Sequence, residues 1–330
     1  MIIIKINNKT YYYDNFDIIT SLDNYNDITY INCNEYRLNA LPQLPNSLQE
    51  LNCSENQLTA LPQLPNSLIK IICYDNELTL LPSLPNSLKY LDCSYNQLIN
   101  LPKLPNLLKK LYCNYNQLTA LPQLPNSLET LWCSENQLTT LSTLQCNTNI
   151  KDMLPNSLLS LHCNKNQLIN LPPLPNLLQI LWCSNNQLTC LPQLPKSLTH
   201  LYCNNNRLVT LPQLQFNTTS IRYFYCNNNQ LTTPSLFQSY SIGTQHNPLT
   251  ELDYKNNLFK IKYSNKIDDK LKLENYMNNK LFVNELQCYY LDSSYHPRNR
   301  FCREKLLYDF DDLFDDDLFN DDLTGDELVR

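Results

Sequence analysis

The sequence predicts a repeat solenoid with a curved parallel β-sheet on its concave face and extended, polyproline-like segments on its convex side. Two observations lead to this prediction. Cysteine recurs in one register, mostly every 20 residues, through a chain of 330 residues, and leucine and proline hold fixed places around each of these cysteines. The register contains Cys33, Cys53, Cys73, Cys93, Cys113, Cys133, Cys163, Cys183, Cys203 and Cys226. A fixed period of this length is typical of solenoids.

Aligned on the cysteine, each unit reads L-x-x-L-x-C-x-x-N-x-L-x-x-L-P-x-L-P. One unit contains Leu48, Leu51, Cys53, Asn56, Leu58, Leu61, Pro62, Leu64 and Pro65. This is the leucine-rich repeat pattern, with cysteine in the last apolar position of the strand. An eleventh unit keeps the spacing without its cysteine, at Leu249, Leu252, Tyr254 and Asn257. We therefore expect a leucine-rich repeat solenoid of about 11 repeats between residues 28 and 260.

Each part of the unit has a structural interpretation. The L-x-x-L-x-C stretch alternates inward and outward residues, which predicts a short strand. The asparagine three positions after the cysteine lies where the chain turns, and its amide can bond backbone groups that leave the strand ladder. The L-P-x-L-P stretch cannot be helical, because proline lacks the backbone donor and biases the residue before it toward extended conformations.

The cysteine column is interpreted as packing, with a metal array or a disulfide framework as the alternatives. The chain has no C-x-x-C pair, and its four histidines do not bracket cysteines at zinc spacing. Free cysteine is a good small buried residue, and here it replaces an aliphatic side chain. We expect no metal site and no cofactor.

The segments outside the repeats predict three further regions. Alternating isoleucines and tyrosines in residues 1–27 predict a β-hairpin cap over the first open edge of the sheet. Residues 261–308 lose the repeat and predict a C-terminal cap, with helical spacing in Leu271, Met277 and Leu281. Residues 309–330 are acidic and predict a disordered tail. An insertion at Ser142 to Met153 predicts a surface loop.

Composition excludes several classes of enzyme and membrane protein. The chain contains two glycines, whereas dinucleotide-binding turns, phosphate-binding loops and hydrolase elbows each need several at fixed spacing. No apolar run approaches the roughly 18 residues of a membrane span. We expect a cytoplasmic, non-catalytic monomer that does not bind a membrane.

The unit with its double L-P-x-L-P resembles the repeats of bacterial secreted effectors of the YopM and IpaH group. Its glycine-poor, asparagine-rich form, with cysteine in the strand, resembles repeat proteins of giant DNA viruses. The resemblance implies a binding scaffold that acts on host cytoplasmic proteins. Proteins of the IpaH type add a helical ubiquitin-ligase domain with a catalytic cysteine, and Cys288 and Cys302 lie in no similar context, so a ligase activity is the least favoured alternative.

The middle column of the concave face is the candidate site. In six consecutive units it carries a ring: Tyr112, Trp132, His162, Trp182, Tyr202 and Tyr225. Exposed aromatic residues in one patch act as anchors in protein interfaces, so these six residues are predicted to bind a protein partner. The alternative is that the rings stack on one another and only stabilise the sheet.

Three classes of function remain open. The preferred one is a protein-interaction scaffold. A glycan-binding or other ligand-binding solenoid is the second, because aromatic stripes also stack on sugars and bases. Nucleic acid is disfavoured, since the few lysines of the concave columns are opposed by acidic residues such as Glu50 and Asp92. An enzyme is the third.

Overall fold

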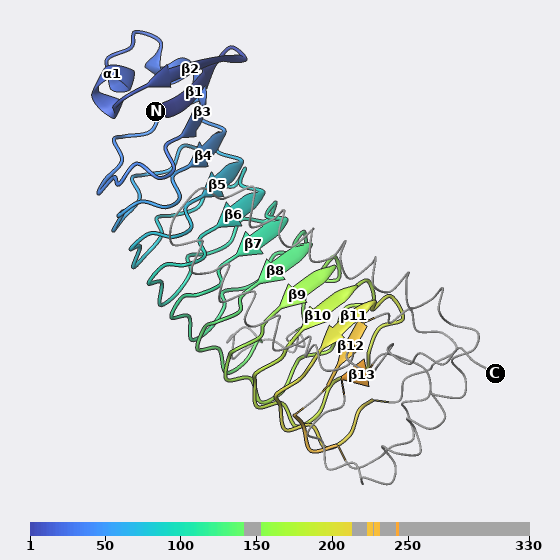
Figure 1. Ribbon diagram of the computed structural model, residues 1–330. Coiled ribbons are helices and arrows are strands. Elements are labelled where there is room, and N and C mark those ends of the chain that lie inside the picture. Colours follow the sequence, from blue (N-terminus) through green and yellow to red (C-terminus); the bar gives the residue numbers. More distant parts are fainter. Residues whose placement is uncertain (142–152, 213–222, 227, 232–241, 244–330) are drawn as a thin grey trace, which may run out of the picture. The chain divides into compact units, whose positions relative to one another are not determined.

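The computed structural model describes residues 1–141, 153–212, 223–226, 228–231 and 242–243, and these residues form one 13-stranded sheet (Figure 1). The strands stack in the order β13-β12-β11-β10-β9-β8-β7-β6-β5-β4-β3-β1-β2. Their bounds are β1 Ile2–Ile6, β2 Lys9–Tyr13, β3 Ile28–Asn32, β4 Glu50–Asn52, β5 Lys70–Ile72, β6 Tyr90–Asp92, β7 Lys110–Tyr112, β8 Thr130–Trp132, β9 Ser160–His162, β10 Ile180–Trp182, β11 His200–Tyr202, β12 Tyr223–Tyr225 and β13 Ile242–Gly243.

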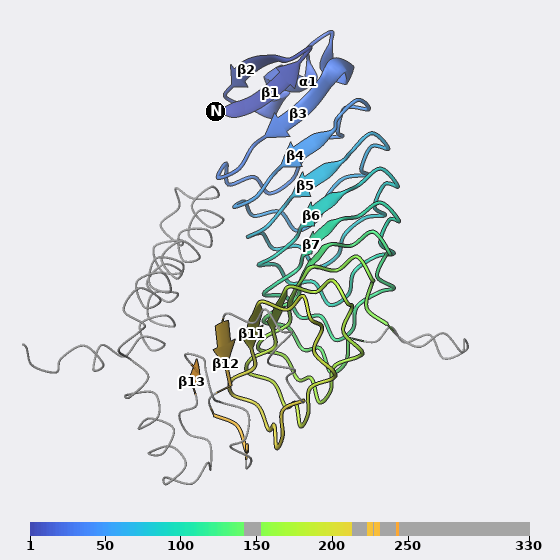
Figure 2. The same ribbon diagram turned by 90° about the vertical axis from the view of Figure 1, so that its right-hand side faces the viewer.

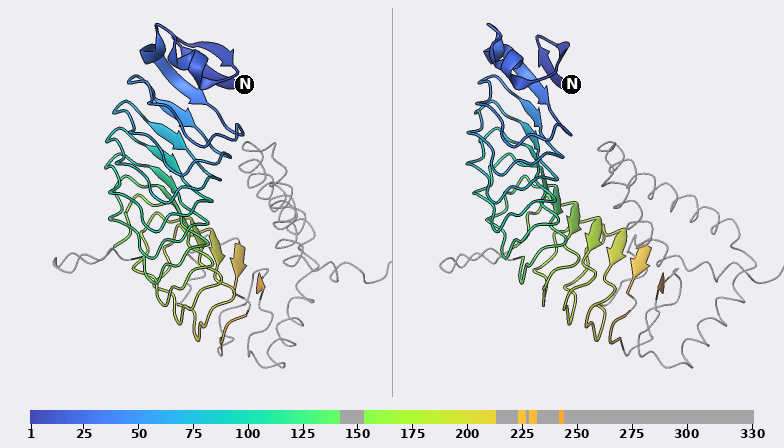
Figure 3. Two further views of the ribbon diagram at one scale, coloured as in Figure 1. Left: turned by 90° about the vertical axis from the view of Figure 1, so that its left-hand side faces the viewer. Right: turned by 60° about the vertical axis from the view of Figure 1, so that its left-hand side comes forward.

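Strands β3 to β13 are parallel, and equivalent positions of adjacent repeats lie side by side. Leu51 pairs with Ile31 on one side and with Ile71 on the other, and this register continues along the repeats. Figures 2 and 3 show the short strands along one side of the turns and the connecting segments on the opposite side. The predicted solenoid with a parallel sheet is confirmed.

The N-terminal residues continue the sheet beyond the first repeat. Strand β1 pairs antiparallel with β2 as a hairpin, and it also pairs antiparallel with β3, whose edge it thereby covers. The short helix α1 (Phe16–Thr20) and the 3₁₀ turn η1 (Tyr25–Asp27) follow, and the sequence analysis anticipated neither. The helix begins where the side chain of Asn15 accepts a hydrogen bond from the backbone N–H of Ile18. Ile19 anchors it in the core.

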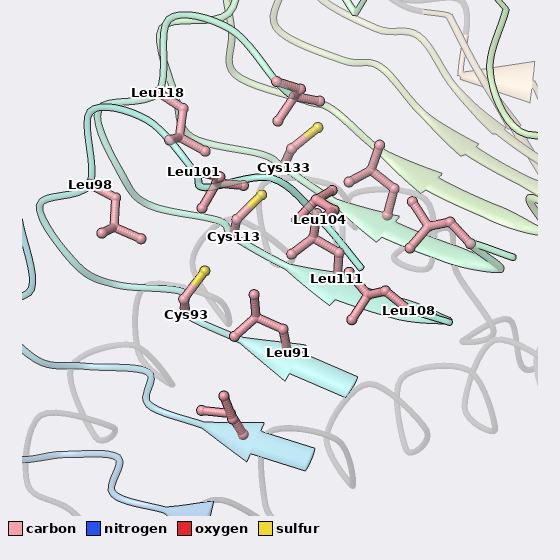
Figure 4. Close-up of a cluster of buried hydrophobic side chains, with 14 of the residues drawn as sticks. Leu91, Cys93, Leu98, Leu101, Leu104, Leu108, Leu111, Cys113, Leu118 and Cys133 are labelled. Carbon is pink, nitrogen blue, oxygen red and sulfur yellow. The ribbon is translucent and has the colours of Figure 1, made fainter. Parts of the chain in front are cut away.

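Leucine and cysteine columns fill the space between the sheet and the convex segments. In the repeat of β4, Leu48, Leu51, Cys53 and Leu58 are fully buried. Figure 4 shows the side chains of Cys93, Cys113 and Cys133 in line in adjacent repeats, among leucines of the same turns. Each repeat therefore shares its core with the repeats before and after it, as nearest-neighbour stacking requires.

The asparagine after each strand bonds backbone groups at the bend, as the sequence predicted, and connects its own turn to the preceding one. The side-chain amide of Asn136 donates to the backbone carbonyls of Cys113, at 2.9 Å, and Cys133, at 3.2 Å. Its side-chain oxygen accepts from the backbone N–H of Leu118 at 2.9 Å. The same bonds recur in neighbouring repeats, so this column satisfies backbone groups that the bend removes from the sheet.

A serine column on the convex side connects the turns in the same manner and was not anticipated. The hydroxyl of Ser127 lies 2.7 Å from the carbonyl oxygens of both Asn106 and Leu108, in the preceding repeat. Ser47, Ser67, Ser87, Ser157 and Ser197 make the equivalent contacts. Leu107 and Leu177 occupy this place in two repeats, and both are exposed.

Every repeat turns through a left-handed residue two positions after its cysteine, which the sequence analysis also missed. The backbone angle φ lies between 51° and 60° at Glu35, Glu55, Asp75, Tyr95, Tyr115, Glu135, Lys165, Asn185, Asn205 and Asn228. None of these residues is glycine, the residue that adopts this conformation without a steric cost. The three asparagines tolerate it better than the others do.

Several predicted segments lie outside the described residues. They are the insertion from residue 142 to residue 152, the eleventh repeat around Leu252, residues 261–308 and the acidic residues 309–330. The strand that pairs with β12 is β13, which precedes the predicted eleventh repeat in the chain. The described strands β3 to β12 correspond to the ten units that contain the cysteine column.

Candidate functional site

The six predicted binding residues lie side by side on the concave face, as the last residues of strands β7 to β12. The strand pairing places Tyr112 beside Trp132, Trp132 beside His162, and His162 beside Trp182. Tyr202 and Tyr225 continue the row on β11 and β12. The structure thus brings together residues that span more than a hundred positions in the sequence. We call these six residues the aromatic ladder.

Each ring of the aromatic ladder contacts the next. Trp132 and His162 stack with centroids 4.4 Å apart and planes 9° from parallel, and Tyr202 and Tyr225 stack at 5.1 Å and 5°. Trp182 lies between the two stacked pairs, with its centroid 5.4 Å from that of His162 and 5.2 Å from that of Tyr202. Both distances lie in the range of favourable aromatic pairs.

The N-terminal end of the aromatic ladder has a different geometry. Tyr112 meets Trp132 edge to face, with centroids 5.0 Å apart and planes 85° apart. Tyr90 contacts Tyr112 at 5.3 Å, and the ammonium group of Lys70 lies 5.0 Å from the centre of the Tyr90 ring. Sequence reasoning missed Tyr90, because it belongs to the neighbouring column. The contact of Tyr90 with Tyr112 joins two columns, and it depends on the size and orientation of the rings, which only the three-dimensional structure shows.

Stacking also buries part of the aromatic ladder. Tyr112 and His162 are only 5% and 6% exposed, which differs from the expectation that the whole column faces solvent. Their neighbours cover them, since rings at these distances exclude water from the space between them. Trp132, Trp182, Tyr202 and Tyr225 are half-buried and supply the surface that remains. Stacking, the alternative interpretation, is thus present in the structure, while partner binding stays a prediction.

His162 is a neutral imidazole in this environment. Burial, with a smaller electrostatic contribution from His200, lowers its pKa from 6.5 to about 3. Its Nε2 atom is buried and has no hydrogen-bond partner within the part of the chain that the structure describes. A buried polar atom of this kind is uncommon in folded proteins and calls for an explanation.

Hydrogen-bonded polar columns run beside the aromatic ladder. The Ser134 hydroxyl donates to the side chain of Asn164, and Ser184 makes the same contact with Asn204. Farther out, the Asn205 amide donates to the side-chain oxygen of Asn185 at 2.8 Å. The sequence analysis did not anticipate these hydrogen bonds, which depend on the strand register.

Charge divides the described concave face into two parts. Charged side chains gather around strands β4 to β7: Glu50, Glu55, Lys70, Asp75, Asp92 and Lys110. These residues belong to four columns of the concave face, three and one positions before and one and two positions after the column cysteine. In the same columns from β8 to β12, the only charged residues among those described are Glu135 and Lys165, which pair with each other at 2.5 Å. The aromatic ladder from Trp132 onward therefore lies in a region where the two described charged residues pair with each other.

The buried cysteines offer no reactive thiolate. Burial raises the pKa of Cys133 and of Cys183 to about 12, and their register neighbours shift in the same direction. Several of these thiols point at the carbonyl of the next strand, as Cys113 does toward Trp132 at 3.4 Å. Among the described residues, no three His, Cys, Asp or Glu side chains lie close enough together to bind a metal ion. No helix of the described residues is long and apolar enough to cross a membrane.

Comparison with known proteins agrees with this architecture. Family models described as "Leucine Rich repeats (2 copies)" and "Leucine Rich Repeat" match residues 107–146 and 87–111. The solved structure of YopM from Yersinia enterocolitica is 37% identical, with a TM-score of 0.58, and the match covers 68% of this chain and 52% of that one. The chain thus spans about half the length of that relative.

A second solved structure extends the likeness. YopM from Yersinia pestis, described as a leucine-rich effector protein, is 34% identical over 67% of both chains, with a TM-score of 0.55. No curated protein matches the chain. From the repeat pattern, the sheet and these matches, the chain belongs to the leucine-rich repeat family and is similar to its YopM-type effector proteins.

Proposed function

We propose that this protein is a non-catalytic scaffold that binds a protein partner through the aromatic ladder. The observation that carries the proposal is the continuous row of contacting rings on the concave face, from Tyr112 to Tyr225. Tryptophan and tyrosine are the residue types that most often dominate binding energy in protein interfaces. The concave surface of a solenoid is also the extended surface on which such proteins bind their partners.

The similarity to secreted effectors supports a host protein as the kind of partner. The Yersinia pestis relative is described as a leucine-rich effector protein, and the resemblance of the repeats to those of secreted effectors implies a host protein as partner. By this analogy the partner is a host protein, and the site of action is the host cytoplasm, where the chain works as a monomer. The giant-virus resemblance remains a prediction from the sequence.

The chemistry of the column cysteines argues against catalysis by a cysteine nucleophile in the repeats. A nucleophilic cysteine needs a lowered pKa and access to solvent. The column thiols are buried, and their pKa values are raised. Cys288 and Cys302, the positions considered for a ligase, lie outside the described residues, and replacing both with alanine is expected to leave the function unchanged.

Affinity capture tests the proposal. Immobilised wild-type protein is compared with a Trp132→Ala/Trp182→Ala variant, and each is prepared with and without residues 309–330. The proposal expects one stoichiometric protein on the wild type that the double variant loses. Equal capture by both would move the site away from the aromatic ladder, and loss on deleting residues 309–330 alone would assign binding to that segment.

A further inference from the structure

We propose that the aromatic ladder recognises an uncharged polypeptide segment that presents a side-chain amide or hydroxyl to Nε2 of His162. The proposal rests on the proposed function, because it assumes that the aromatic ladder is the binding surface. It adds the chemistry of the partner and the residue that selects it. Three observations support it: the ring geometry, the absence of unpaired charge and the buried imidazole.

Ring geometry determines which part of each ring a partner can meet. In the Trp132–His162 and Tyr202–Tyr225 pairs the faces are turned to each other, with planes within 9° of parallel. A base or another ring inserted between them would need the planes about 7 Å apart, twice the contact distance of carbon atoms. The inner faces of these two pairs are therefore occupied, so a partner meets the edges of these four rings, where aromatic side chains have their polar atoms.

Charge restricts the partner further. From β8 to β12 the described concave columns contain mainly aromatic, serine and asparagine side chains, together with Thr130, Ile180 and His200, and Glu135 and Lys165 neutralise each other. A carboxylate or ammonium group of the partner would lose its water against this surface without an opposite charge to replace it, which is costly. Tyrosine, serine and asparagine are the residue types with which antibody loops bind polypeptides, through edge contacts and adaptable hydrogen bonds.

His162 supplies the specific contact. It lies between the two indoles, at 4.4 Å from Trp132 and 5.4 Å from Trp182, and its Nε2 is buried without a described partner. Because burial holds the ring neutral, Nε2 can exchange a hydrogen bond with an amide or hydroxyl but offers no charge to a carboxylate. Because Nε2 is covered in the free protein, the segment reaches it by displacing a neighbouring ring. A segment with an amide or hydroxyl then gains a hydrogen bond that the free protein lacks, and a segment without one does not.

A library of random linear peptides displayed on phage provides the probe. It is selected on the immobilised full-length protein, and recovered peptides are synthesised and titrated against four proteins. These are the wild type, Trp182→Ala, His162→Phe, which keeps a stacking ring and removes both nitrogens, and His162→Gln, which keeps a hydrogen-bonding group. Glu50→Gln, at an exposed position of the charged region, is the matched control. Circular dichroism verifies that each variant is folded.

The inference expects peptides rich in Asn, Gln, Ser and Tyr, with affinities that change less than about twofold between low and high salt. His162→Phe should weaken them about tenfold, the effect of one buried hydrogen bond, whereas His162→Gln should weaken them less and Glu50→Gln not at all. Charged peptides with steep salt dependence, or equal binding to His162→Phe, would overturn the inference while leaving the proposed function in place. Peptides that bind Trp182→Ala as well as wild type would contradict the proposed function itself.

Discussion

Trp132 and His162 stack face to face with ring centroids 4.4 Å apart, although an insertion of the chain lies between their repeats. Strands β8 and β9 pair in the same register as their neighbours, so the insertion leaves the sheet unbroken. The contact places an imidazole between two indoles, where it is 6% exposed. This arrangement leads to predictions about the acid stability and the fluorescence of the protein.

The first prediction is that His162 makes the fold sensitive to acid. Its pKa is about 3 when folded and 6.5 when exposed, so between these values the unfolded chain binds a proton that the folded chain does not. Stability is therefore complete above pH 6.5 and decreases as the pH falls toward 3. The loss at about pH 4.5 should be on the order of 2 to 3 kcal/mol.

Urea unfolding of wild type and His162→Phe at neutral and acidic pH measures this effect. Carboxylates titrate in the same window and affect both proteins equally, so the difference between the two isolates the histidine. His200→Phe is a second comparison: because His200 also lowers the pKa of His162, its removal should slightly reduce the acid loss. An equal acid loss in wild type and His162→Phe would show that the imidazole is not neutral in the fold.

The second prediction concerns fluorescence, because Trp132 and Trp182 are the only two tryptophans of the chain. Both are half-buried in the aromatic ladder. The free protein should emit as partly exposed indole, and binding of a partner should shift the emission to shorter wavelength as the rings lose water. Trp182→Ala should cost roughly 2 kcal/mol of binding free energy. An unchanged spectrum on saturation would place the partner elsewhere.

The third prediction is that the column cysteines act only by packing. Cys133→Val should change the free energy of unfolding by less than about 1.5 kcal/mol, because the volume and apolar character are roughly conserved. Cys133→Asp should unfold the neighbouring repeats. A thiol reagent on the native protein should label Cys190, the exposed cysteine among those described, and spare the buried column. Rapid loss of column thiols without unfolding would contradict this interpretation.

The fourth prediction is that the asparagine column is essential to the turns. Asn136→Ala removes bonds to the carbonyls of Cys113 and Cys133 and to the backbone N–H of Leu118, all of them buried. We expect a loss of about 3 kcal/mol, since each buried group left unpaired costs about 1 kcal/mol or more. Gln137→Ala, on the exposed neighbour, should cost little. Thermal unfolding of the two variants makes the comparison.

The fifth prediction uses a natural exception in the serine column. Ser127→Ala should cost about 1 kcal/mol, because its hydroxyl bonds two carbonyls of the preceding repeat. Leu107→Ser introduces the same hydroxyl where an exposed leucine now stands, so it should stabilise the protein by a similar amount. A destabilised Leu107→Ser variant would mean that the leucine packs on a neighbour.

The sequence by itself determined the repeat, the parallel strands, the buried cysteine column and the role of Asn136. These features depend on spacing, and spacing within a solenoid becomes register directly, because each unit contacts only its neighbours. The same relation between spacing and register predicted that the six rings lie in one column. It did not predict helix α1, which a single capping residue, Asn15, starts outside the repeat.

Only the tertiary structure decided how the rings meet. Ring orientation, the burial of His162 and the contact with Tyr90 depend on the size and tilt of neighbouring side chains, which the one-letter pattern does not encode. The left-handed turn residues could not be predicted from the sequence for a related reason. Glycine is the usual sequence signal for that conformation, and here Glu135 and Lys165 adopt it because the bonds of the adjacent turns hold the backbone in place.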